Sequence, residues 1–384
     1  MNIKRINKLR EILIKNDIDG ALYGVSGNMY YLLDDPSFTF QRTPETASLK
    51  PSQKDYFNNK TDVILYIPVD GEPILITTYN RIDSFKNTSI KKYTCFYDRL
   101  VRQLHPHLKG KKLAVGLSCR SHLESIITQI NPNVEIVSGE EFVESLRAIK
   151  DEKEIEILKE LAKLTDYAMG EVLKEIKAGI SQYGIGDIIA RIGKENGATE
   201  LPFFPNAVFT QTGHPTSRKR GAYKKDWPLE KNTAIAFDFG YVKNGYCSDF
   251  GRSFYFGDAS DKVKDAYSAL QSAQMKVIQT IKPGDKINSY LKILTDELKQ
   301  HGFEKNLFKH SEIIPMGHQI GINVHEHPWI NTEVNQTFKP GMVMCIEPKI
   351  WLLGEAYIRV EDMVLITEEG AESLTTFDRE KFEI

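Results

Sequence analysis

Four carboxylates interrupt stretches of the sequence that otherwise read as buried strands, and they constrain the fold more than any other feature. Asp238 and Asp249 lie in TAIAFDFGYVKNGYCSDFGRSF, whereas Glu347 interrupts GMVMCIEPKIW and Glu361 interrupts AYIRVEDMVLI. A buried carboxylate without a partner is strongly destabilising or takes up a proton. Four of them in one chain therefore require a common explanation, which a shared cation would supply.

The dipeptide Asn244-Gly245 predicts a tight hairpin that brings the first two acids together, because both central positions of a type I′ turn need positive φ. With this dipeptide as the loop, the numbers of paired residues add up to 489, so Asp238 lies opposite Gly251. Asp249 is two residues from that partner, and both carboxylates then point to one face. A pair of solvated acids near a turn is the competing interpretation, but the apolar run AIAF beside them argues against exposure.

Histidines follow in PMGHQIGINVHEHPW, residues 315–329. Gly317 precedes His318 and allows the backbone to bend sharply or to approach a bulky neighbour. His325 and His327 share one face of a predicted strand. A lone histidine is more often a core or surface residue, but carboxylates together with one imidazole suit Mn²⁺, Co²⁺, Fe²⁺ or Zn²⁺. Several bridging carboxylates favour two metal ions about 3.5 to 4 Å apart.

The N-terminal part of the chain predicts an α/β domain. Its first 148 residues alternate helical patterns with short apolar runs such as GALYGV, DVILYIPV, EPILITTY and KKLAVGL. A strongly helical stretch follows, in which Asp151 and Glu154 predict a capping box. We expect residues 1–148 and 149–384 to form separate domains, because the chain is too long for one ordinary core.

The second of these domains has a different pattern. Strands with Gly and Asn turns dominate after residue 200, and helices are expected around residues 262–282 and 287–302. The predicted class of the whole chain is therefore α+β, with a smaller α/β domain first.

Composition predicts a folded cytoplasmic protein. The 50 basic and 52 acidic residues give a formal charge of -2, which offers no electrostatic footprint for nucleic acid or an anionic membrane. The charged N-terminal segment lacks the apolar core of a signal peptide or a membrane span. The cysteines show neither metal-type pairing nor a disulfide framework, which favours reduced thiols: Cys95, Cys119, Cys247 and Cys345.

Two polar segments are candidates for contact with a substrate. Residues 33–62 form a long polar segment punctuated by prolines, which predicts either an ordered insertion or a mobile loop that could reach a neighbouring active site. The basic segment SRKRGAYKK, residues 217–225, could attract a substrate carboxylate through Arg218 or Arg220. A solvated loop is the simpler interpretation of that basic segment.

The order of the acids and histidines resembles the pita-bread metallopeptidases, which include methionine aminopeptidase, Xaa-Pro aminopeptidase and prolidase. LRAIKDEKEIEILKELAKLTDYAM is similar to the helical entry to the family's catalytic domain, and LREILIKNDIDGALYGVSGNMYYL resembles a creatinase-type N-terminal domain. That N-terminal domain favours the Xaa-Pro aminopeptidase and prolidase branch. The resemblance implies a C-terminal pita-bread fold, residues 149–384, preceded by a smaller creatinase-like α/β domain, residues 1–148.

The resemblance also implies a ligand set for two divalent ions, with Mn²⁺ expected and Co²⁺, Zn²⁺ or Fe²⁺ as alternatives. Asp238 would bind one ion, and Asp249 and Glu361 would bridge both. His318 would bind the other ion, together with Glu347, which would also carry protons as the catalytic residue.

Further residues would contact the substrate by the same resemblance. His325 would donate a hydrogen bond to the developing oxyanion, and His214 would lie on the substrate side of the site. Each of the two histidines is expected both to take part in catalysis and to bind substrate. Arg359 resembles the arginine that supports the last glutamate, and Trp351 keeps the bulk of an aromatic residue that lines the substrate pocket. His327 is expected to be a neighbour of the site.

The sequence departs from the family pattern at three places, and all three are expected to alter the substrate pocket. Ile314 stands where the Xaa-Pro peptidases carry a substrate-binding histidine, and Gln319 is expected to add a side chain near the metal. Where the family commonly has Pro-Gly-x-Tyr, this chain has Pro348-Lys349-Ile350-Trp351 and so loses a phenol hydroxyl. No expected ligand is lost.

The sequence therefore predicts a metal-dependent hydrolase that cleaves small peptides at an X-Pro bond and forms a homodimer by resemblance, with no nucleic-acid or membrane partner. Two alternatives remain open at this point. The same metal centre could act on a non-peptide C–N or C–S bond, because relatives of this fold include creatinase and a sulfonium-compound lyase; creatinase-like chemistry itself works without metal, and such proteins lose the acidic ligands. The chain could instead be a pita-bread binding protein without catalysis, although such relatives typically lose ligands.

Overall fold

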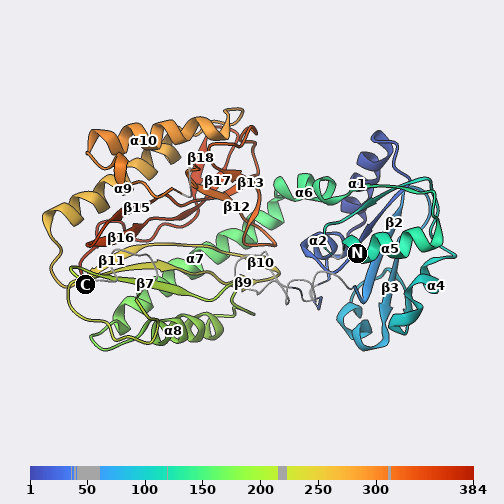
Figure 1. Cartoon of the computed structure of the whole chain (residues 1–384), viewed down its shortest axis with the longest axis horizontal. Helices are drawn as coiled ribbons and strands as arrows, with labels where there is room; N and C mark the ends of the chain where they lie inside the picture. Colours follow the sequence, from blue (N-terminus) through green and yellow to red (C-terminus); the bar gives the residue numbers. More distant parts are fainter. Residues whose placement is uncertain (36, 39, 41–60, 119, 215–222, 310–312) are drawn as a thin grey trace. The chain divides into compact units, whose positions relative to one another are not determined.

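The computed structural model describes residues 1–35, 37–38, 40, 61–118, 120–214, 223–309 and 313–384. By contacts between Cα atoms the chain divides into two compact units, Met1–Arg147 and Ala148–Ile384 (Figure 1). Most of the predicted insertion at residues 33–62 lies outside the described residues, as do Cys119 and both Arg218 and Arg220 of the basic segment.

The first unit is built on a six-stranded sheet with the order β4-β3-β2-β1-β5-β6. The strand β1 pairs antiparallel with β2 and parallel with β5, and its four residues are all buried. Such a central position explains why the runs predicted as strands are continuously apolar. The strands are β1 (Gly20–Tyr23), β2 (Val63–Pro68), β3 (Ile74–Thr78), β4 (Lys91–Cys95), β5 (Lys112–Val115) and β6 (Glu135–Ser138).

Helices accompany this sheet, beginning with α1, as the sequence predicts. The side chain of Asn2 caps α1 by accepting from the backbone N–H of Arg5, and Ile6, Leu9 and Leu13 on one face of the helix are buried. The helices of this part of the chain are α1 (Ile3–Lys15), α2 (Gly27–Leu33), α4 (Leu100–Leu104), α5 (Arg120–Ile130) and α6 (Glu140–Ala148).

The second unit begins at a helix whose cap the sequence predicts. The carboxylate of Asp151 accepts from the N–H of Glu154, and the Glu154 carboxylate accepts from the N–H of Asp151, so the capping box is confirmed. The helices of this unit are α7 (Glu152–Glu175), α8 (Gln182–Glu195), α9 (Asp261–Thr280) and α10 (Tyr290–Gln300). The last two confirm the helices expected after residue 260.

The strands of the second unit lie between the helix pair α7–α8 and the helix pair α9–α10 (Figure 1). They form sheets with the orders β11-β8-β7 and β13-β12-β14-β17-β18, and two-stranded pairs β10-β9 and β15-β16. Their bounds are β7 (Asn206–Gln211), β8 (Thr233–Asp238), β9 (Val242–Lys243), β10 (Tyr246–Cys247), β11 (Ser253–Phe256), β12 (Gly317–Gln319), β13 (Glu326–Ile330), β14 (Val343–Ile346), β15 (Lys349–Leu352), β16 (Ala356–Arg359), β17 (Asp362–Ile366) and β18 (Ala371–Ser373).

The hairpin predicted at Asn244-Gly245 is present. Both residues have positive φ, 52° and 84°, as a type I′ turn requires. Lys243 pairs with Tyr246 next to the turn, and Thr233 still pairs with Phe256 at the far end, so the register set by the turn holds along the whole hairpin.

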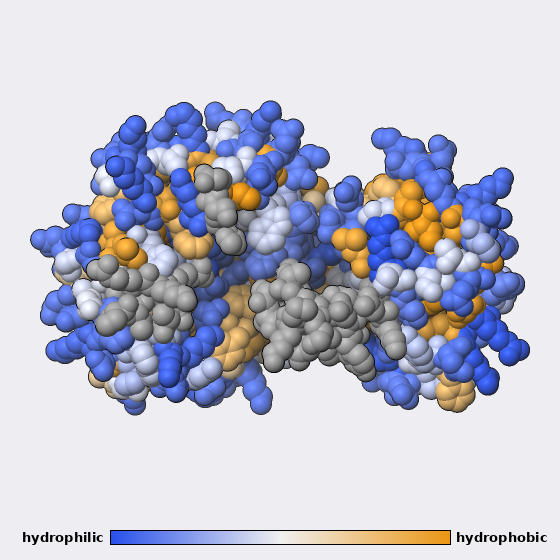
Figure 2. Space-filling view, viewed as in Figure 1, coloured by the Kyte–Doolittle hydropathy of each residue, from blue (hydrophilic) through white to orange (hydrophobic). Residues whose placement is uncertain are grey.

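Hydropathy shows no membrane-spanning helix in the part of the chain that the structure describes. No helix there is both long enough and apolar enough to cross a bilayer. On the visible face of each unit, hydrophobic residues occur as patches among hydrophilic ones (Figure 2).

Candidate metal centre

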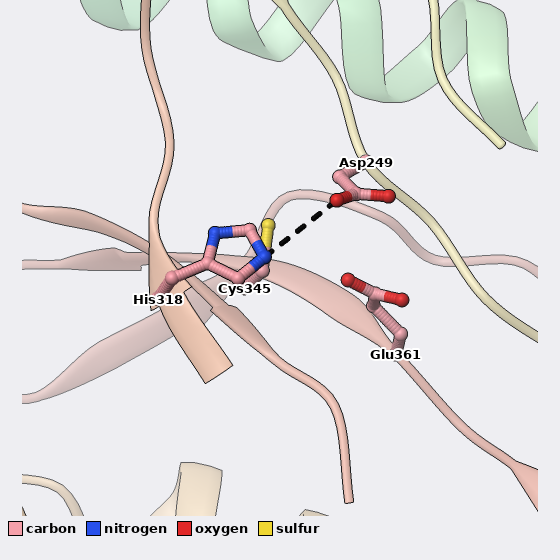
Figure 3. A group of neighbouring side chains, drawn as sticks. All are labelled: Asp249, His318, Cys345 and Glu361. Carbon is pink, nitrogen blue, oxygen red and sulfur yellow. Dashed lines mark ion pairs between the residues drawn. The ribbon is translucent and has the colours of Figure 1, made fainter. Parts of the chain in front are cut away.

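Four buried side chains from separate segments of the second unit gather at one point: Asp249, His318, Cys345 and Glu361 (Figure 3). One donor atom from each lies within 4.8 Å of the others. Their exposed fractions run from 0% for Cys345 and Glu361 to 4% for Asp249. We refer to these four residues as the ligand cluster.

Strand register places two members of the ligand cluster side by side. His318 on β12 is the cross-strand partner of Cys345 on β14, so their side chains share one face. Gly317 makes this approach possible, because a Cβ there would lie 1.8 Å from the carbonyl oxygen of Cys345. Its φ of +152° is also one that side-chain-bearing residues rarely adopt.

The two acids of the ligand cluster come from irregular segments between strands. Asp249 follows β10, and Glu361 lies between β16 and β17. The backbone N–H of Glu361 donates to the carbonyl of Gly251 at 2.7 Å, which joins the two segments. A Cβ on Gly251 would lie 2.4 Å from Cδ of Arg359, so only glycine fits between them.

The ligand cluster contains buried donor atoms without a hydrogen-bond partner in the described part of the chain. Asp249 Oδ1 and Glu361 Oε1 are buried and have no hydrogen-bond partner among the described residues. Nδ1 of His318 lies 3.0 Å from the carbonyl oxygen of Gln319. This contact assigns the N–H to Nδ1, and the lone pair of Nε2 then faces Asp249 Oδ2 at 3.6 Å (Figure 3). These donors fit a divalent cation, which would satisfy all three atoms at once.

Electrostatics lead to the same conclusion. Burial, followed by the charges of Glu361 and Asp238, raises the pKa of Asp249 well above its usual range. Burial, followed by the charge of Glu347, does the same to the pKa of Glu361. Burial also lowers the pKa of His318, so its imidazole is held neutral, the form that binds metal. A bound cation would allow both carboxylates to ionise.

The other two expected ligands are paired with cations of the chain itself. Arg359 Nη1 contacts Asp238 Oδ2 and lies 3.3 Å from Glu361 Oε2, and its Nη2 lies 3.6 Å from Glu347 Oε2. The ammonium of Lys349 contacts the same Glu347 Oε2. Burial acts to raise the pKa of Glu347, but the charges of Lys349 and Arg359 outweigh it and lower that pKa to about 2. Arg359 thus contacts three of the four acids.

His325 lies beside the ligand cluster within an aromatic group. Its ring centroid is 4.4 Å from that of His318, with the planes nearly perpendicular, and 5.2 Å from that of Trp329. Burial, followed by the electrostatic interaction with His318, lowers the pKa of His325 to about 4, so its imidazole is neutral at pH 7 but still carries one N–H. His327 is exposed, with its centroid 6.4 Å from Trp329.

The remaining predicted residues occupy several different places. His214 lies after β7, its ring centroid 5.7 Å from those of both Tyr223 and Trp227. Trp351 is half-buried on β15, where strand alternation places it on the same face as Lys349.

Two of the departures from the family pattern also have defined surroundings. Ile314 is partly buried and packs against the core that α9 and α10 help to form. Gln319 does not add a side chain near the metal, because it alternates with His318 along β12 and its side-chain oxygen accepts from Lys150 at 2.6 Å.

Sequence reasoning missed three residues of this site. Lys349 was noted only as part of an altered motif, although its position two residues after Glu347 predicts a shared face. Cys345 is two residues before Glu347, but its approach to His318 depends on the pairing of β12 with β14. Trp329 pairs with His318 across β12 and β13, which no local signal reveals.

Comparison with known proteins identifies relatives along the whole chain. The sequence pattern of Metallopeptidase family M24 matches residues 156–368. A Xaa-Pro dipeptidase of Pyrococcus horikoshii is 26% identical over 380 residues, which cover 98% of both chains. An uncharacterized peptidase of Staphylococcus aureus is 30% identical over 379 residues, which cover 98% of this chain and 99% of the other.

A solved structure supports the fold. The crystal structure of the prolidase from Pyrococcus horikoshii matches with a TM-score of 0.81 at 22% identity, covering 98% of this chain and 99% of that one. The expected α+β class is thereby confirmed, with a pita-bread fold that follows a smaller α/β domain.

Proposed function

The chain belongs to metallopeptidase family M24, and from this premise we propose that it hydrolyses small peptides at an X-Pro bond. The observation that carries the proposal is the ligand cluster, in which two buried carboxylates, each with one unpartnered oxygen among the described residues, lie together with a neutral imidazole. A relative named Xaa-Pro dipeptidase, which matches the chain over almost its full length, supports the proline specificity.

The metal centre would use the five residues with the family's ligand order: Asp238, Asp249, His318, Glu347 and Glu361. Family membership implies divalent ions, and we propose two of them, with Mn²⁺ as the native metal, because the donors are mostly oxygen. Such ions supply Lewis-acid polarisation of the scissile carbonyl and a lowered pKa for the attacking water.

We assign the movement of protons to Glu347. Its Oε1 lies 3.8 Å from His318 Nε2, and its other oxygen is held by Lys349 and Arg359. A carboxylate with a pKa of about 2 is ionised at neutral pH, which is the form that would accept the proton of the attacking water. It would then donate that proton to the leaving amine.

His325 would stabilise the negative charge that develops on the scissile carbonyl oxygen. Its neutral imidazole donates one N–H, and its ring is fixed between His318 and Trp329. A donor held in place beside a buried site stabilises a developing oxyanion without reorganisation.

The substrate pocket would be lined by aromatic residues, and His214 and Trp351 remain proposals as its further members. Trp329 joins them, since it is half-buried and lies beside His325. Arg359, in contrast, is engaged with three carboxylates. We therefore assign it the support of the metal ligands in addition to the predicted contact with substrate.

We further propose a cytoplasmic homodimer. Cys95 and Cys345 are free thiols, which is the usual state of cysteine in a reducing compartment. Dimerisation is proposed by resemblance of the N-terminal domain to the creatinase type, and size-exclusion chromatography with light scattering tests it.

The decisive experiment compares peptides that differ at one position. Purified protein loaded with Mn²⁺ is assayed on X-Pro dipeptides, X-Pro-X tripeptides and the matching X-Ala peptides. We expect the X-Pro series to be cleaved preferentially, and the shorter or longer series to define dipeptidase or aminopeptidase action. Glu347→Gln should abolish turnover and leave the circular dichroism spectrum unchanged. Equal cleavage of X-Ala peptides would contradict proline specificity, and full activity of the variant would contradict the role of Glu347.

A further inference from the structure

The five expected metal ligands fall into two groups that differ in their partners. Asp249, His318 and Glu361 lie together in the ligand cluster, where Asp249 Oδ1 and Glu361 Oε1 have no hydrogen-bond partner among the described residues. The second oxygen of Glu361, in contrast, meets a cation, at 3.3 Å from Arg359. Asp238 and Glu347 are instead paired with cationic side chains, the first with Arg359 and the second with Lys349. A metal ion can enter the first group directly but must compete with a resident cation for each member of the second.

Lys349 is held in this position by its strand and by its burial. It opens β15, directly opposite Arg359 on β16, and only 7% of its surface is exposed. Its ammonium contacts Glu347 Oε2, two residues earlier in the chain. A buried ammonium that loses its carboxylate partner is left uncompensated, so this contact resists displacement.

The net charge of the site also favours one tightly bound ion. The carboxylates of Asp238, Asp249, Glu347 and Glu361, when all are ionised, face the cations of Lys349 and Arg359, which leaves two negative charges. One divalent ion neutralises this remainder. A second ion would enter a site that is already neutral and would approach the ammonium of Lys349, a like charge in a buried setting.

We propose that Lys349 sets the metal stoichiometry of the site: one divalent ion binds tightly at the ligand cluster, and Lys349 competes with a second ion for Glu347. The proposal rests on the metal centre of the proposed function. A positioning role follows for Lys349, because it holds one oxygen of Glu347 and leaves the other directed at His318.

The test measures ions bound, without a peptide substrate. Full-length protein is freed of metal by dialysis against a chelator and titrated with Mn²⁺ by isothermal calorimetry, with bound metal counted by elemental analysis at fixed free Mn²⁺. For the unaltered chain we expect one tight equivalent and a second that is at least about tenfold weaker. Lys349→Met should tighten the second equivalent by at least about tenfold. Two equal equivalents in the unaltered chain, or an unchanged isotherm in the variant, would overturn the proposal.

Two further variants separate this role from general disturbance of the site. In Lys349→Met combined with Glu347→Gln, the gain should vanish, because the freed ligand is removed; a gain that persists contradicts competition for Glu347. Lys276→Met is the matched control, since that exposed lysine on α9 lies 3.9 Å from Glu297 and should bind metal like the unaltered chain. Lys349→Gly is also titrated with Mn²⁺ and should bind the second ion as tightly as Lys349→Met does. If one of the two variants fails to fold, the other still tests the proposal.

The outcome is independent of the peptidase assay. The expected isotherms with no cleavage of X-Pro peptides would reject the proposed function and keep the role of Lys349. Cleavage of X-Pro peptides by a chain that binds two equal metal equivalents would support the proposed function and reject the role of Lys349.

Discussion

The carbonyl oxygen of Cys345 occupies the space where a Cβ of residue 317 would lie, at a separation of 1.8 Å. Gly317 therefore permits β12 and β14 to pair at the point where His318 meets Cys345. The geometry of the ligand cluster depends on the absence of one side chain.

Gly317→Ala should damage both stability and metal binding. The added methyl group must push β12 away from β14, and the φ of +152° is strained for alanine, so we expect a loss of about 2 kcal/mol or more in the free energy of unfolding. Urea unfolding and Mn²⁺ titration measure the two effects. Gly170→Ala on α7 is the control, because its nearest neighbour would be Phe377 at 3.8 Å, and it should be neutral or slightly stabilising. Equal behaviour of the two variants would contradict this reading of the strand pair.

Metal removal should destabilise the second unit, because the buried acids of the ligand cluster lose their counter-charge. An ion present at a hundredfold excess over its Kd adds about 2.7 kcal/mol to the free energy of unfolding. Differential scanning calorimetry with chelator and with Mn²⁺ measures the shift in Tm.

Asp249→Asn should raise the Tm of the metal-free protein and reduce the gain in Tm from Mn²⁺. The substitution removes a carboxylate whose pKa is raised by burial and then by Glu361, so the metal-free variant should melt higher than the metal-free parent chain. It should also gain less from added Mn²⁺. A variant that melts lower without metal and responds fully to it would show that Asp249 is not under electrostatic strain.

Local signals in the sequence predict the elements on which the site is built. Asn244-Gly245 determines a turn, and the turn determines the register as far as Thr233 and Phe256, because pairing propagates along a regular hairpin. Asp151 and Glu154 predict the start of α7 for a similar reason, since a capping box is complete within four residues. Glutamates inside apolar runs indicate buried acids without any knowledge of their partners.

Contacts across strands lie beyond such reasoning. Arg359 reaches Asp238 because β16 lies beside β8, and Trp329 reaches His318 because β12 pairs with β13. For Gln319 the sequence predicts a contact with the site that the structure does not have. A one-residue step along β12 turns its side chain away from the site and toward Lys150. Each of these facts depends on tertiary pairing, which no window of neighbouring residues encodes.

The pH dependence of stability should carry a contribution from Asp166 on α7. Its Oδ2 accepts from the N–H of Thr376 at 2.6 Å, but its Oδ1 is buried without a hydrogen-bond partner among the described residues, and burial raises its pKa. An acid with a raised pKa in the folded state contributes stability below its unfolded pKa and loses it as pH rises through the folded pKa. Asp166→Asn keeps the acceptor and cannot ionise, so its advantage over the parent chain should grow between about pH 3 and pH 7.

Glu383 provides the comparison for this experiment. It accepts from the N–H of Ala259 and pairs with Lys264, and these contacts lower its pKa. Its contribution is therefore present above its unfolded pKa and is lost as pH falls through the folded one. Chemical unfolding of Glu383→Gln over the same range should show a disadvantage that grows with pH. Parallel profiles for the two variants would contradict the opposite signs assigned to them.

Trp329 should determine how well the site accepts proline. Its half-buried indole lies 5.2 Å from the ring of His325, beside the point where the scissile carbonyl would lie, and offers an apolar face to a pyrrolidine ring. Trp329→Ala should lower kcat/KM for X-Pro peptides by about tenfold or more, mostly through KM, because an apolar contact to the substrate is lost. Trp329→Phe should retain most of the activity.

Two measurements separate substrate contact from damage to the metal centre. Trp329 also lies 5.5 Å from His318, so bound Mn²⁺ is counted in each variant and should be unchanged. His327→Ala removes an exposed neighbour on the same strand and should leave both kcat and KM as they are. If Trp329→Ala lowers kcat/KM for X-Ala and X-Pro peptides equally, or if the variant loses bound Mn²⁺, then the indole supports His318 and has no part in recognising proline.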